Sequence, residues 1–150
     1  MIDDLGPIES AAVLFLRLWS DGPTGREDVL IGFEAALGKS AGARATAEFA
    51  QLYDLCLHYG RRALVRHDVK CRCLGADESC FGTFLACAVE GASEDAALIA
   101  TLIVRPDMAL PLAGLAQSVG LSLLRVGKAS VPAIRSKTSP ANTPTSTRLH

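Results

Sequence analysis

The sequence predicts an all-α fold, a compact bundle of five to six helices in one domain. Ala and Leu supply much of the apolar content of 49%, while aromatic residues make up only 5%. Both residue types lose little side-chain freedom in a helix, whereas β-branched residues lose more. Apolar residues also recur at helical spacing, and Gly or Pro separates the segments. A chain of 150 residues is long enough to bury a real core.

Three helices are expected in the first part of the chain. The first covers 7–20, because Pro7 suits a first helical turn and an apolar stripe follows it. The second runs from Thr24 to Gly38, because Thr24 and Glu27 have the spacing of a capping box. The third covers roughly 42–59 and carries a buried aromatic and aliphatic face.

Three more helices are expected in the second part. One starts near Asp77, whose charge favours a helix N-terminus, and ends at Gly91. The next covers 93–104, between a capping serine and a proline. The last covers 108–119, and residues 121–126 either extend it or form a short strand.

The domain is expected to cover residues 1–126, followed by a disordered basic tail at 127–150. Three prolines lie among eight Ser and Thr residues in that tail, a composition typical of disorder. All 16 acidic residues lie at or before Asp107, so the body is mildly acidic and the tail is basic. An acidic body argues against bulk binding of nucleic acid.

No targeting signal is found, and the longest apolar run, 96–104, is too short to span a bilayer. We therefore expect a cytoplasmic protein without a membrane partner. Thiols stay reduced in the cytoplasm. The five cysteines accordingly favour metal binding, redox chemistry or core packing over structural disulfides.

The run from His67 to Cys73 is the most distinctive part of the sequence, inside an irregular connection expected at 67–76. Alternate residues of an extended backbone point the same way, so His67, Cys71 and Cys73 would share one face. Three soft or borderline ligands on one face suit zinc, although the Cys-x-Cys spacing is tighter than usual. We therefore expect a zinc site here.

A closed structural zinc site needs a fourth ligand, and two residues are candidates. Cys80 lies in the first turn of the next helix, where the helix N-terminus would stabilise its thiolate. His58 lies on the face of the preceding helix opposite Phe49, so we do not expect it to be buried in the core. With water as the fourth ligand the site would instead resemble a catalytic zinc. The sequence leaves the identity of the metal open.

Two other interpretations of the cysteines stay open. Cysteine is often a small buried hydrophobe, so the run could pack as the inner face of a strand. Cys56 and Cys87, on apolar helix faces, fit this packing role better than ligation. Alternatively, Cys71 and Cys73 form a redox pair, because nearby cations stabilise a thiolate and a Cys-x-Cys disulfide is strained and easily reduced.

The densest positive stretch of the chain lies at residues 61–72, where only Asp68 opposes the charge. Such a stretch can bind phosphates of nucleic acid. A solvated face explains it better, because few aromatic residues accompany the charges. The stretch contains Arg61, Arg62, Arg66, Lys70 and Arg72.

Taken together, these features favour a small cytoplasmic interaction or regulatory module in which zinc organises the connection. A nucleic-acid-binding regulator that uses the basic stretch is one alternative, and a thiol redox protein or sensor is the other. No nucleophile–base pair or pair of carboxylates indicates an enzyme. The expected partner is a protein, and the apolar stripes fit a homodimer interface as well as a monomer core.

Overall fold

The computed structural model describes residues 1–146, and side chains are described for residues 1–129. Within 1–146 the chain folds into six α-helices and two short 3₁₀ helices. No β-strand occurs within 1–146, where the extended pairing is one isolated antiparallel bridge between Gly60 and Val104. The predicted all-α bundle of five to six helices is confirmed. The elements in chain order are η1 (Ile2–Asp4), α1 (Pro7–Ser20), α2 (Pro23–Leu37), α3 (Lys39–Tyr59), α4 (Ala76–Val89), α5 (Ser93–Ile103), η2 (Pro106–Met108) and α6 (Ala109–Ser146).

Glycine and proline set several of the helix boundaries, as the sequence indicates. Pro7 is the first residue of α1, where its missing N–H costs no hydrogen bond. Gly38 separates α2 from α3 at a φ of +92°, a conformation that glycine adopts without steric cost. Helix α3 begins at Lys39, three residues before the predicted start at 42, because the chain turns directly at this glycine.

An aromatic cluster joins the first four helices in the core. Phe49 of α3 is fully buried and lies within 6.5 Å of four other rings, measured between ring centroids. Most of these contacts are edge-to-face, the geometry that aromatic quadrupoles favour. The four rings are Phe15 and Trp19 of α1, Phe33 of α2 and Phe81 of α4.

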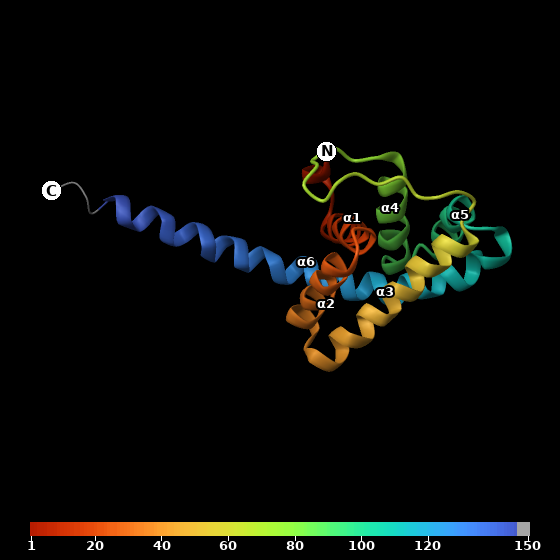
Figure 1. Ribbon diagram of the computed structural model, residues 1–150, viewed down its shortest axis with the longest axis horizontal. Helices are drawn as coiled ribbons and strands as arrows, with labels where there is room; N and C mark the ends of the chain where they lie inside the picture. Colours follow the sequence, from red (N-terminus) through yellow and green to blue (C-terminus); the bar gives the residue numbers. More distant parts are fainter. Residues whose placement is uncertain (147–150) are drawn as a thin grey trace.

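Helix α6 runs through the centre of the bundle and contacts each of the other five α-helices. Figure 1 shows its first part among them and its last part extending away from the body. Its central position requires an apolar surface, and Leu112, Ala116, Val119 and Leu123 are fully buried. Residues Pro106–Ala129 are long and apolar enough to cross a membrane by length and composition, with a mean hydropathy of 1.4. Only 33% of the apolar window is buried inside the bundle, and Leu110 and Leu121 are exposed.

The domain boundary after residue 126 and the disordered tail at 127–150 stay predictions. Helix α6 continues through residue 127 to Ser146, and residues 147–150 lie outside the described part of the chain. Helix α6 has no break between 126 and 127.

Candidate functional site

Residues 60–75, which we call the connection, join α3 to α4 and belong to neither helix (Figure 1). They reverse direction in a turn at Asp68. The Cys71 N–H donates to the Asp68 carbonyl at 3.0 Å, and the Lys70 N–H donates to Asp68 Oδ1 at 3.0 Å. The extended run assumed for residues 67–73 is therefore wrong. Asp68 bonds its own backbone two residues on, as aspartate favours in turns.

Exposure along the connection nevertheless alternates, although the chain is not extended. His67, Val69 and Cys71 are half-buried, while the polar residues between them are exposed. Cys73 breaks the pattern because it is exposed. The shared inner face predicted for His67, Cys71 and Cys73 thus includes only the first two.

A buried ion pair lies beneath the connection. Arg17 of α1 donates from Nε to Glu78 Oε2 at 2.6 Å and from Nη2 to Oε1 at 2.9 Å. Both side chains are fully buried. Two parallel charge-assisted hydrogen bonds match the planar guanidinium to the planar carboxylate and fix their orientation.

The remaining donors of Arg17 hold the backbone of the connection. Nη1 donates to the carbonyl oxygens of Asp68 and Cys71, at 3.1 and 2.6 Å, and Nη2 donates to that of Cys73 at 2.7 Å. Buried carbonyl groups without partners would cost free energy. The Arg17 guanidinium therefore stabilises the backbone around both cysteines.

Glu78 holds the connection from the other side, through backbone N–H groups. The N–H of His67 donates to its Oε2 and that of Gly75 to its Oε1, each at 3.0 Å. Burial alone would raise the pKa of Glu78. The hydrogen bonds from Arg17, Gly75 and His67 outweigh burial and lower this pKa to about 2. Glu78 is therefore ionised throughout the physiological range.

The first half of the connection has its own anchor, the neighbouring Asp77 of α4. Both of its oxygens accept hydrogen bonds from Arg62, and Oδ2 also accepts the N–H of Val65 at 2.7 Å. The hydrogen bond from Arg62 is the main cause of the lowered pKa of Asp77. Two consecutive acids at the start of α4 thus serve the connection as well as the helix dipole.

The ends of the connection pair with distant segments. At its start, the Arg61 N–H donates to the Ile103 carbonyl at the end of α5, at 3.0 Å. Near its end, Arg72 forms an ion pair with Asp3 and accepts the Ile2 N–H at its carbonyl, at 3.1 Å. The connection is consequently bound to helices α1, α4 and α5 and to η1.

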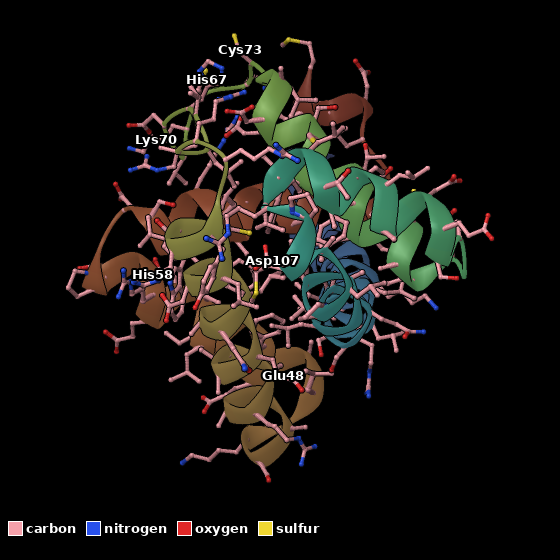
Figure 2. All side chains as sticks on the ribbon, turned by 90° about the vertical axis from the view of Figure 1, so that its right-hand side faces the viewer. Glu48, His58, His67, Lys70, Cys73 and Asp107 are labelled. Carbon is pink, nitrogen blue, oxygen red and sulfur yellow. The ribbon has the colours of Figure 1, made fainter. Side chains whose placement is uncertain are left out.

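The predicted zinc ligands occupy different environments. Cys80 is half-buried against the core, and exposed His58 has its Nδ1 2.9 Å from the Asp54 carbonyl oxygen of its own helix. Figure 2 shows His58 well away from His67 and Cys73, which lie at the far edge of the molecule. Among the residues with described side chains, no three His, Cys, Asp or Glu residues form a group that could hold a metal. Hydrogen bonds to Arg17 and Glu78 hold the backbone of the connection.

Two thiols do lie together on the connection. The Cys73 N–H donates to Cys71 Sγ at 3.4 Å. The thiol of Cys73 also hydrogen-bonds Cys71, and that bond, followed by the charge on Cys71, raises the pKa of Cys73. Exposure of Cys73 leaves this pair open to solvent and to reagents. Cys56, by contrast, belongs to the core, as expected from its helix face.

Most cations of the basic stretch have partners within the protein. Arg62 and Arg72 form ion pairs with Asp77 and Asp3. Arg61 and Arg66 donate to carbonyl oxygens of Thr101 and Ser20. Lys70 lies at the turn and projects outward (Figure 2). Much of the positive charge is therefore already compensated or engaged by local contacts.

Arg17 and Glu78 are the residues that sequence reasoning missed. One signal for Arg17 was present, because it is the only charged residue between Glu9 and Asp21, within a strongly apolar helix. An arginine surrounded by core residues needs a buried partner. Nothing in the sequence identifies Glu78 as that partner, because it already fits a helix N-terminus.

Comparison with known proteins found no matching family model, no similar curated protein and no similar solved structure. The functional argument therefore rests on the geometry of the connection.

Proposed function

We propose that this protein is a small helical interaction or regulatory module whose functional element is the connection, with Cys71 and Cys73 as its thiol switch. Connections longer than about 12–15 residues without secondary structure are uncommon in compact domains and are usually either functional or disordered linkers. Hydrogen bonds to Arg17, Asp77 and Glu78 hold the backbone of this one, which favours a functional segment. The single observation that carries the proposal is the pair of adjacent thiols on a connection whose backbone is held by buried Arg17.

The proposed chemistry is reversible disulfide formation. A peroxide oxidises one thiol to a sulfenic acid and is itself reduced, releasing water when the oxidant is hydrogen peroxide. The second thiol then attacks that sulfur, and a second water leaves as the disulfide forms. A dithiol reductant restores both thiols by exchange. No metal or other cofactor takes part in this cycle.

Oxidation would reach the rest of the connection through the backbone. Arg17 binds the carbonyl oxygens of Cys71 and Cys73, so drawing the two sulfur atoms into a bond shifts groups that this guanidinium holds. Cys-x-Cys disulfides are strained rings and are easily reduced. A partner protein that contacts the connection would therefore distinguish the reduced form from the oxidised form.

Peptide mapping after treatment with one equivalent of hydrogen peroxide tests the proposal. Trypsin cleaves after Lys70 and Arg72, and Glu-C protease cleaves after Glu78. Cys71, Cys73 and the pair Cys80 and Cys87 therefore fall in three separate peptides unless a disulfide joins them. We expect the joined peptides, with the loss of two hydrogen atoms, and faster amide exchange in residues 67–75. The Cys80→Ser variant should behave like the parent protein, and Cys71→Ser should not form the product.

Two results would refute this function. One is oxidation that joins other cysteines or stops at a sulfinic acid. The other is a Cys71–Cys73 disulfide that leaves amide exchange in 67–75 unchanged, because a switch must alter the surface that a partner contacts.

The zinc hypothesis stays a second candidate, and the adjacent thiols of Cys71 and Cys73 favour it. Since no third ligand lies with them in the described residues, zinc would need ligands from a partner or a second copy of the chain. Metal analysis of untagged protein, purified without chelators, tests this. Less than a tenth of an equivalent of zinc would count against it.

The nucleic-acid hypothesis is supported less well, because most cations of the basic stretch have intramolecular partners. It predicts binding that weakens steeply with salt and weakens further in the Arg61→Ala/Arg62→Ala variant. Binding that is indifferent to salt would remove this candidate.

A further inference from the structure

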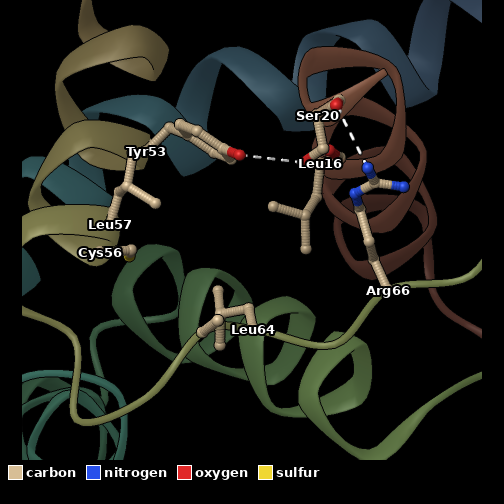
Figure 3. A pocket seen from close by; sticks show the side chains of 8 residues that line it. Leu16, Ser20, Tyr53, Cys56, Leu57, Leu64 and Arg66 are labelled. Carbon is tan, nitrogen blue, oxygen red and sulfur yellow. Dashed lines mark hydrogen bonds between the residues drawn. The ribbon is translucent and has the colours of Figure 1, made fainter. Parts of the chain in front are cut away.

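A small pocket lies between α1, α3 and the first half of the connection (Figure 3), and its lining includes neither thiol of the proposed switch. Its volume is about 110 Å³. Apolar side chains form most of its wall, and polar groups lie on one side. The lining residues are Leu16, Ser20, Tyr53, Cys56, Leu57, Ala63, Leu64 and Arg66.

The polar side of the pocket is built from three elements. The Ser20 hydroxyl donates to the Leu16 carbonyl at 2.8 Å, and the hydroxyls of Ser20 and Tyr53 are hydrogen-bonded to each other at 3.3 Å. Arg66 Nη2 donates to the Ser20 carbonyl at 3.2 Å, which holds the guanidinium beside these hydroxyls (Figure 3). The guanidinium of Arg66 and the hydroxyls of Ser20 and Tyr53 therefore line the same side of the pocket.

Arg66 differs from the other arginines near the connection because it lacks an acidic partner. Arg17, Arg62 and Arg72 each form an ion pair, whereas Arg66 forms none within the part of the chain whose side chains are described. The opposite wall carries no competing negative charge. Burial raises the pKa of Cys56 to about 12, so its thiol stays neutral.

We propose that this pocket binds a short aliphatic monocarboxylate, with the chain against Leu16, Leu57 and Leu64 and the carboxylate on Arg66. A guanidinium matches a carboxylate in a two-point geometry, and the apolar wall excludes a ligand that is charged throughout. Size limits the chain. An apolar cavity of ~150 Å³ accepts benzene, so the smaller volume here suits roughly four or five carbons. This proposal does not depend on the thiol switch.

Titration of methyl-labelled protein with sodium pentanoate, followed by NMR, tests the proposal. We expect saturable shifts at the methyl groups of Ala63, Leu16, Leu57 and Leu64. Pentan-1-ol, which has the same chain without the charge, should bind at least tenfold more weakly, and pentylamine should not bind. Losing one charge-assisted contact changes affinity by this order.

Matched variants assign the carboxylate to its cation. Arg66→Gln should raise the Kd for pentanoate at least tenfold, while Arg44→Gln, at an exposed arginine of α3 that does not line this pocket, should leave it unchanged. The Cys71→Ser/Cys73→Ser variant should bind pentanoate normally. Equal Kd values for pentanoate and pentan-1-ol, an unchanged Kd in Arg66→Gln, or shifts that do not saturate at these methyl groups would each overturn the proposal.

Discussion

Arg17 of α1 and Glu78 of α4 lie 61 residues apart in the chain, yet they form a two-bond ion pair with both side chains fully buried. Every buried side-chain nitrogen and oxygen atom among the described residues has a hydrogen-bond partner. A fully satisfied buried pair fixes one arrangement, because any other arrangement leaves a charge without a partner. The pair therefore selects the path of the connection above it.

Removing one partner should destabilise the protein strongly. Arg17→Met keeps much of the side-chain volume but leaves the Glu78 carboxylate buried and unpaired. We expect the free energy of unfolding to fall by about 3–5 kcal/mol, measured by urea denaturation. Arg72→Met breaks an exposed ion pair and should cost less than about 1 kcal/mol. Equal losses in the two variants would contradict the role assigned to Arg17.

Removing both partners should separate global stability from order in the connection. The Arg17→Met/Glu78→Leu variant replaces the charges with apolar groups, so the part of the lost free energy of unfolding that comes from the unpaired carboxylate should return. The carbonyl oxygens of Cys71 and Cys73 still lose their donor. Amide exchange in 67–75 should therefore be faster than in the parent protein. Unchanged exchange there would show that the pair does not hold the connection.

Acid should remove the contribution of Glu78 to stability. Its pKa is about 2 in the folded protein and 4.5 as the ordinary value, so its contribution is fully present above about pH 4.5. That contribution is lost as the pH falls toward 2, and it amounts to about 3 kcal/mol. Urea denaturation between pH 6 and 2 measures the loss. The slope should be shallower in Glu78→Gln, and identical slopes would exclude this assignment.

The cysteines should differ in reactivity according to their surroundings. In the native protein at pH 8, iodoacetamide should label exposed Cys73 and leave Cys56 intact, because Cys56 is 6% exposed and its pKa is about 12. Removing the sulfur that raises the pKa of Cys73, in Cys71→Ala, should speed labelling of Cys73. Peptide mass spectrometry measures both rates. Slower labelling in that variant would contradict the hydrogen bond between the thiols.

Two helical glycines should respond to alanine with opposite signs. A Cβ at Gly25 would lie 1.9 Å from the Leu18 carbonyl oxygen, where α2 approaches α1, so Gly25→Ala should cost about 1–3 kcal/mol. Gly114 is exposed in α6, and a methyl group added there would meet nothing within 4 Å, so Gly114→Ala should gain up to about 1 kcal/mol. Thermal unfolding midpoints give the signs. A stabilised Gly25→Ala would mean that the two helices separate easily.

Local patterns were sufficient to predict the helices. Pro7, Gly38 and the acids at the start of α4 act within a few residues of the boundaries they set, so their effects can be inferred without knowing the fold. The apolar stripes likewise identified the core faces, including that of Phe49. Disorder after residue 126 was inferred from composition alone and stays a prediction.

The candidate site was only partly predictable, because its geometry is non-local. The irregular connection was predicted at 67–76, whereas the segment between α3 and α4 covers 60–75. The turn at Asp68 replaces the extended run that would align His67 with both cysteines. The group that organises the connection, Arg17, comes from a helix some fifty residues earlier in the chain. Such a pairing follows from how α1 packs on α4, which a single sequence does not specify.

The position of α6 also bears on how the protein is made. This helix follows the other five in the chain and contacts all of them. During translation, α1 to α5 must therefore leave the ribosome before the segment that covers their apolar faces has been synthesised. Leu112, Ala116 and Leu123 complete the core only at that late stage. Until then, a nascent chain of this protein would expose apolar surface on α1 to α5. Such surface favours aggregation, against which chaperones protect nascent chains.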